Sequence, residues 1–202
     1  MNLRVDATYF KRFCVVSYQD NGLNYTQLFR FSDGEHYIEI KEDLENLLKL
    51  ENSIASITCD GHKSTLKAIQ KVMPHVKVQR CLVHIQRMCI LWISKKPQSD
   101  AGKQLLGLVY QLLKIKSQND KKDWLKRFYK WKETHQGFLS HRTYYPSGRY
   151  GYTHKLLRRS FMVMHRALPN MFHYLDDPKI PHTTNGIEGS FSHLKNHLDV
   201  HR

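Results

Sequence analysis

Hydrophobic and polar positions in the first 80 residues form short alternating or apolar stretches, interrupted twice by a helical pattern. The short stretches are bounded by turn residues and predict five β-strands, at residues 3–9, 13–18, 24–31, 53–59 and 75–79. Apolar residues at helical spacing predict helices over 36–50 and 62–73, and Pro74 ends the second. Three strands, a helix, a strand, a helix and a strand indicate a mixed sheet with helices on its faces.

After Arg80 the pattern becomes helical. Apolar spacing predicts helices over 81–94, 101–116, 120–135 and 155–168, and the Pro, Gly and Tyr residues of 141–154 predict a loop. Trp124, Phe128 and Trp131 are interpreted as helix core. The predicted fold class is α/β, a ribonuclease-H-like mixed sheet with an all-helical insertion before the last helix. We therefore divide the chain into a core (1–94), an insertion (95–175) and a final core helix (176–202).

The last helix carries an acidic residue whose role the local pattern leaves open. Ile187, Phe191, Leu194 and Leu198 fall on one stripe, so Glu188 lies on a second stripe beside the buried one. One interpretation is a capping box, in which Asn185 caps the helix and Glu188 bonds back to its backbone. The other is a functional carboxylate.

Charge is distributed unevenly along the 202 residues, whose net charge is +14. Residues 1–60 carry 6 Lys and Arg against 10 Asp and Glu, whereas residues 61–202 carry 26 against 8. Such asymmetry indicates a polyanionic partner, with nucleic acid favoured over an anionic membrane. No run of 18 apolar residues predicts a membrane span, and four cysteines without framework spacing suit a reducing, intracellular compartment.

Two isolated acids in the sheet region are candidates for chemistry. Asp6 lies inside the first predicted strand, and Asp60 follows the buried strand 53–59. A carboxylate within a strand is costly unless it is exposed or binds something, and the tip of a buried strand is a common ligand site. If the first and fourth strands are neighbours, the two carboxylates meet, and a divalent cation relieves their repulsion.

Four segments resemble the catalytic domain of a Mutator-like DDE transposase: LRVDATYF, SITCDGHKST, RCLVHIQR and TTNGIEGSFSHLKNHLDVHR. The resemblance implies that Asp6, Asp60 and Glu188 are a catalytic triad that binds Mg²⁺ or Mn²⁺. It also implies two-metal DNA strand cleavage and strand transfer, with transposon ends and target DNA as partners and a homodimer or higher assembly on DNA. Such a protein is expected in the bacterial cytoplasm or nucleoid, or in a nucleus.

Cys81 and His84 form a Cys-x-x-His pair that recurs in the transposases this chain resembles. A structural zinc site needs four ligands, and the pair supplies two of them. The alternative is a packed cysteine with a histidine that is hydrogen bonded or faces DNA.

Basic and aromatic residues of the second half are candidates for DNA contacts. Residues 114–166 hold 14 Lys and Arg against 3 acids, and tyrosines are interleaved with the cations. The residues expected to contact DNA are Arg80, Tyr144, Tyr145, Arg149, Arg158, Arg159 and Lys195. Two other functions fit the same pattern: a transposase-derived DNA-binding protein without catalysis, and a ribonuclease-H-like nuclease that cuts without joining.

Overall fold

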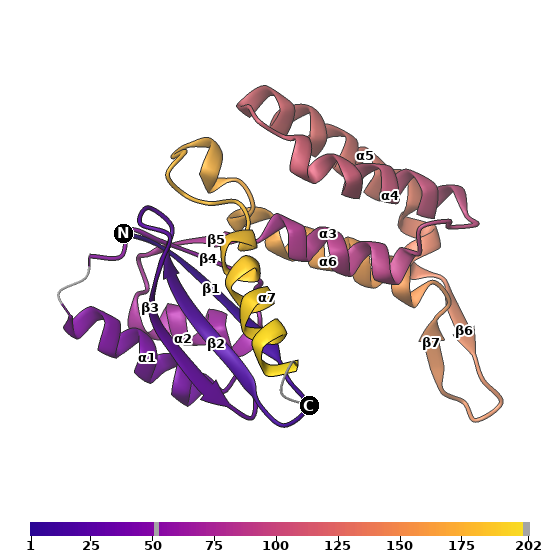
Figure 1. Cartoon of the computed structure of the whole chain (residues 1–202). Helices are drawn as coiled ribbons and strands as arrows, with labels where there is room; N and C mark the ends of the chain where they lie inside the picture. Colours follow the sequence, from indigo (N-terminus) through magenta and orange to yellow (C-terminus); the bar gives the residue numbers. More distant parts are fainter. Residues whose placement is uncertain (51–52, 200–202) are drawn as a thin grey trace. The chain divides into compact units, whose positions relative to one another are not determined.

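The computed structural model describes the backbone of residues 1–50 and 53–199 (Figure 1). It divides the chain into two compact units, Met1–Cys81 with Asn170–Arg202, and Leu82–Pro169. The first unit contains a mixed sheet and the second is largely helical, so the chain is a mixed α/β protein. The helix that follows Cys81 is grouped with the helical unit, whereas the sequence-based division placed residues 81–94 with the sheet.

The first unit is built on a five-stranded sheet, and all five predicted strands are confirmed. Its order is β3-β2-β1-β4-β5. Strands β1, β2 and β3 pair antiparallel, whereas β1 with β4 and β4 with β5 pair parallel. The bounds are β1 Asn2–Tyr9, β2 Cys14–Asp20, β3 Tyr25–Ser32, β4 Ser56–Cys59 and β5 Lys77–Arg80. The expected adjacency of the first and fourth strands is therefore confirmed.

Helices cover both faces of this sheet (Figure 1). Helices α1 (Tyr37–Lys49) and α2 (Lys63–Val72) pack against one face, in a core that includes Leu3, Val5 and Ile57. Helix α7 (Asn185–Asp199) packs against the other face through Ile187 and Phe191, which contact Val15. Successive strand residues point to opposite faces, so Asp6, next to Val5, faces the side of α7.

The second unit contains four helices and a β-hairpin within the described residues. Helices α3 and α6 run side by side, as do α4 and α5 (Figure 1). Trp124 and Phe128 are fully buried and stack at 4.9 Å between ring centroids, which confirms their interpretation as core. The bounds are α3 Leu82–Ile93, α4 Asp100–Gln111, α5 Gln118–Ser140, β6 Arg142–Tyr144, β7 Tyr150–Tyr152 and α6 Lys155–Ala167.

The expectation of an all-helical insertion with a loop at 141–154 was wrong. Strands β6 and β7 pair antiparallel there, with Thr143 opposite Gly151. No residue of either strand is buried: β6 is exposed throughout, and β7 is exposed or half-buried. The alternation of buried and exposed residues that reveals a strand was therefore missing. Short 3₁₀ turns lie at Leu112–Lys114, Leu168–Asn170 and His173–Leu175. No helix in the described part of the chain is long and apolar enough to cross a membrane.

Candidate active site

Asp6 is held in the middle of β1 by hydrogen bonds to both carboxylate oxygens. Its side chain is only 7% exposed. The Ala7 backbone N–H donates to Oδ1 at 2.9 Å, and the Thr184 hydroxyl donates to Oδ2 at 2.8 Å. Thr184 is fully buried and comes from the far end of the chain, just before α7. The contact therefore fixes one rotamer of Asp6 and ties β1 to the start of α7.

Asp60 lies at the carboxyl end of β4, beside the strand that carries Asp6. Val5 pairs with Cys59, so the two aspartates follow paired residues on neighbouring parallel strands. The His62 backbone N–H donates to Asp60 Oδ1 at 2.8 Å, which closes a tight turn. Gly61 makes this turn with φ +86°, a conformation that favours glycine.

Arg80 sits on the same turn. It is buried at the end of β5, and its Nη2 donates to the Asp60 carbonyl oxygen at 2.8 Å. A Cβ on Gly61 would lie 1.9 Å from Arg80 Cζ, so the guanidinium fills the space that a side chain at 61 would need. Arg80, expected from the sequence to contact DNA, thus orders the Asp60 turn in this structure.

Glu188 reaches Asp6 from the first turn of α7. A carboxylate oxygen of Glu188 and a carboxylate oxygen of Asp6 lie within 4.8 Å of each other. The Thr184 carbonyl accepts from the backbone N–H groups of Ile187 (2.9 Å) and Glu188 (3.4 Å), so the helix begins after Thr184. Ile187, and not Glu188, then takes the third helical position that a capping-box carboxylate occupies. This geometry argues against the capping box that was one interpretation of Asn185 and Glu188.

The Thr-Asn-Gly-Ile-Glu run also has a steric requirement at its glycine. A Cβ on Gly186 would lie 1.9 Å from Arg4 Nη1. Arg4, from β1, donates through this nitrogen to Gln19 Oε1 at 3.1 Å and also bonds Asn21. The glycine therefore lets α7 approach the sheet closely enough for Glu188 to reach Asp6.

A fourth carboxylate, Glu35, belongs to the same region and was missed by the sequence reasoning. Its side chain is 10% exposed, and Oε1 accepts from the Tyr9 hydroxyl at 3.0 Å. Burial raises the pKa of Glu35, and the nearby charges of Asp60 and Asp6 raise it further, against the opposing effects of His62 and Tyr9. Its only sequence signal was a position between the turn at Gly34 and α1.

Cys81 takes part in the network that holds Asp6. Its Sγ lies 3.4 Å from both the backbone nitrogen and the hydroxyl of Thr184. In the part of the chain that the structure describes, Cys81 belongs to no group of three side chains able to hold a metal. Cys81 is fully buried, and its contacts with Thr184 are those of a packed side chain. His84 is half-buried on α3, in the helical unit.

The other expected DNA contacts lie mostly on exposed surface. Tyr144, Tyr145 and Arg149 are exposed on the β6–β7 hairpin, and Lys195 is exposed on α7. The guanidinium carbon of Arg158 lies 4.1 Å above the Tyr152 ring, and that of Arg159 lies 4.2 Å above Trp92. The last two therefore use part of their surface within the helical unit.

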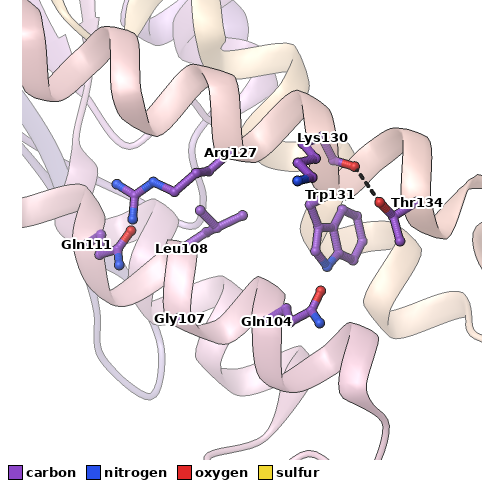
Figure 2. A pocket seen from close by; sticks show the side chains of 8 residues that line it. All are labelled: Gln104, Gly107, Leu108, Gln111, Arg127, Lys130, Trp131 and Thr134. Carbon is purple, nitrogen blue, oxygen red and sulfur yellow. Dashed lines mark hydrogen bonds between the residues drawn. The ribbon is translucent and has the colours of Figure 1, made fainter.

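The helical unit also has a hollow of about 430 Å³ between α4 and α5, lined by two cations, Arg127 and Lys130 (Figure 2). Gly107 leaves it open on the α4 side, and no carboxylate, cysteine or histidine lines it. The hollow thus has no metal ligand of these types and no carboxylate, thiol or imidazole for acid–base chemistry. The carboxylates of the sheet unit are therefore the candidate site.

Comparison with known proteins identifies a family for the central part of the chain. Residues 44–137, from α1 into α5, match the family model of the Mutator family of transposases. The match covers just under half of the chain and includes Asp60, Cys81 and His84. It confirms the resemblance to a Mutator-like transposase and supports transposase function in general. No curated protein matches the chain.

Proposed function

We propose that this chain is the catalytic domain of a DDE transposase, which cleaves DNA strands and joins their ends to a target. The observation that carries the proposal is the approach of Asp6 and Glu188 to within 4.8 Å, from opposite ends of the sequence. Asp60 stands on the adjacent parallel strand. The strand order β3-β2-β1-β4-β5 supports a ribonuclease-H-like core, with Leu82–Pro169 inserted before the helix that carries Glu188.

The residues fit a divalent metal. Asp6, Asp60 and Glu188 offer hard oxygen ligands, the type that Mg²⁺ and Mn²⁺ prefer. The raised pKa of Glu35, caused by burial and then by Asp60 and Asp6, reflects the negative charge gathered here. Asp6, Asp60 and Glu188 would hold such an ion, which would supply activation of a water or a DNA 3′-hydroxyl toward a phosphodiester and stabilisation of the leaving oxygen.

The chain's own residues fix the ligands and bind the substrate. Thr184 orients Asp6, while the His62 N–H and the Arg80 guanidinium hold the turn at Asp60. The excess of Lys and Arg after residue 60 neutralises DNA phosphates. Transposon ends and target DNA are the proposed partners, with two or more copies of the chain assembled on them.

A strand-cleavage assay tests the proposal. Purified protein is incubated with pre-cleaved and uncleaved transposon ends and a supercoiled target, with Mg²⁺, with Mn²⁺ or with EDTA. Metal-dependent nicking together with joined products is expected, and EDTA should remove both. Nicking without joining would make the protein a nuclease. Binding without either product would make it a transposase-derived DNA-binding protein, and both results contradict the proposal.

Thr184→Val tests the orienting contact on Asp6. Valine keeps the volume of threonine but removes the hydroxyl that donates to Asp6 Oδ2. We expect the Mn²⁺ concentration for half-maximal cleavage to rise about tenfold, from loss of a hydrogen bond to a charged group. DNA affinity measured in EDTA should not change. Thr184→Ser restores the donor and should restore the metal requirement, whereas an unchanged valine variant would contradict the role.

A further inference from the structure

The β6–β7 hairpin presents an aromatic face built from residues of both strands. Arg142 pairs with Tyr152, and Tyr144 pairs with Tyr150, in an antiparallel register. Directly opposed residues, and residues two apart on one strand, share a face of a ribbon. These four side chains therefore share one face, and Tyr144 and Tyr150 are 70% and 53% exposed on it.

Cation–π contacts brace this face. The Arg142 guanidinium carbon lies 4.3 Å from the centre of the Tyr150 ring and 5.8 Å from that of Tyr152. The guanidinium carbon of Arg158, from α6, lies 4.1 Å from the centre of the Tyr152 ring. A two-stranded hairpin alone is only marginally stable in water. Arg142 thus braces the Tyr150 ring, and the Tyr144 ring lies against Tyr150 with 5.9 Å between centroids.

The opposite face of the ribbon carries Thr143, Gly151 and Thr153, whose side chains are small or absent. The hydroxyls of Thr143 and Thr153 lie 2.7 Å apart. A Cβ on Gly151 would lie 3.3 Å from the Tyr145 hydroxyl oxygen, so Tyr145 lies close to this strand. The Thr153 backbone N–H donates to the His141 carbonyl at 3.0 Å and closes the base of the hairpin. The face with Tyr144 and Tyr150 is thus the one on which two exposed rings lie next to each other, with centroids 5.9 Å apart.

Charge around the hairpin selects an anionic ligand. No aspartate or glutamate occurs between Glu133 and Asp176, whereas this interval holds six Lys and Arg. Arg149 is exposed beside the turn at the hairpin tip. Flat exposed rings next to guanidinium groups are the combination that binds unpaired bases and their phosphates.

We propose that the Tyr144–Tyr150 face is a stacking platform for unpaired DNA bases next to a strand end. This rests on the proposed function, because cleavage and joining create such ends. Arg149 contacts the phosphate backbone, while the two rings stack on bases released from the duplex. The ligand is therefore a DNA end with a single-stranded extension, and a blunt duplex offers the platform nothing to stack on.

The test measures DNA binding in EDTA, so that failure of the catalytic proposal leaves its outcome untouched. Fluorescence anisotropy compares a blunt duplex with the same duplex bearing a short 3′ extension that contains 2-aminopurine. The wild-type protein should bind the extension more tightly and quench its fluorescence. The double variant Tyr144→Ala/Tyr150→Ala should lose about tenfold in affinity for the extension, the loss expected for one stacked base, and should lose the quenching. Its affinity for the blunt duplex should stay the same.

Conservative and charge variants separate stacking from other effects. Tyr144→Phe/Tyr150→Phe keeps both rings and should bind as the wild type does, and Tyr110→Ala, an exposed tyrosine on α4, is the matched control. Arg149→Ala should weaken binding of both the blunt and the extended duplex. It should also lower the slope of log affinity against log salt by about 0.9, the value for one phosphate contact.

Several results would overturn the proposal. They include the same affinity of wild type and double alanine variant for the extended duplex, equal losses in the phenylalanine and alanine variants, and unchanged quenching in the alanine variant. Weakened binding to anionic phospholipid vesicles with unchanged DNA binding would assign the face to a membrane surface and overturn it as well.

Discussion

Replacing Glu188 by glutamine lowers metal-dependent strand cleavage by about a thousandfold or more, because the change removes a hard anionic ligand that the metal needs. The substitution keeps the shape of the side chain, and Ile187 and Phe191 still hold α7 on the sheet. Without metal, the melting temperature should stay the same or rise, since one of two carboxylates within 4.8 Å has lost its charge. Strand cleavage of transposon ends in Mn²⁺ measures the loss of activity, and thermal unfolding in EDTA measures the melting temperature.

Two comparisons make this result specific to the site. Glu133→Gln removes an exposed carboxylate of α5 and should leave cleavage unchanged. Asp60→Asn should lose as much activity as Glu188→Gln, and the double variant should lose no more than either, because residues that serve one site are not additive. Equal activity of wild type and Glu188→Gln would return Glu188 to a structural role and contradict the proposed mechanism.

The fold of the sheet unit could be predicted because its pattern is local. Each strand is a short run of alternating or apolar residues, and the turns at Asn21-Gly22 and Gly34 separate them. The helices of the second unit have apolar stripes that end at Pro or Ser, and these were found as well. The β6–β7 hairpin was missed because cation–π contacts, and not a buried apolar face, support its strands.

The candidate site was predictable only where the chain's local pattern marks it. Asp6 and Asp60 interrupt or end apolar strands, so each stood out by itself. Glu188 has a local alternative as a helix cap, and the resemblance to a family was needed to choose between them. The roles of Glu35 and Thr184 could not be read from the local pattern, because their contacts join residues far apart in the sequence: Tyr9 with Glu35, and Asp6 with Thr184. Hydrogen bonds over such separations follow from the tertiary packing alone.

Gly61→Ala should both destabilise the sheet unit and impair cleavage, because Gly61 combines two constraints. Its φ of +86° costs a non-glycine residue about 1–2 kcal/mol. The new Cβ would also meet the Arg80 guanidinium at 1.9 Å, and its displacement breaks the hydrogen bond to the Asp60 carbonyl. A hydrogen bond to a charged group contributes about 1.5–3 kcal/mol, so we expect a total loss of about 3 kcal/mol. Denaturant unfolding measures it.

A double-variant cycle separates the two causes. In an Arg80→Ala background the clash is absent, so Gly61→Ala should cost only the strain of its positive φ. Cleavage gives the second readout, because a shift of about 1 Å in a reacting group lowers the rate about a hundredfold. Gly61→Ala should therefore lose activity at temperatures where it is fully folded, and Arg80→Lys, which has no planar fork to reach the Asp60 carbonyl, should lose part of it. Full activity of folded Gly61→Ala would show that the position of Asp60 does not depend on this turn.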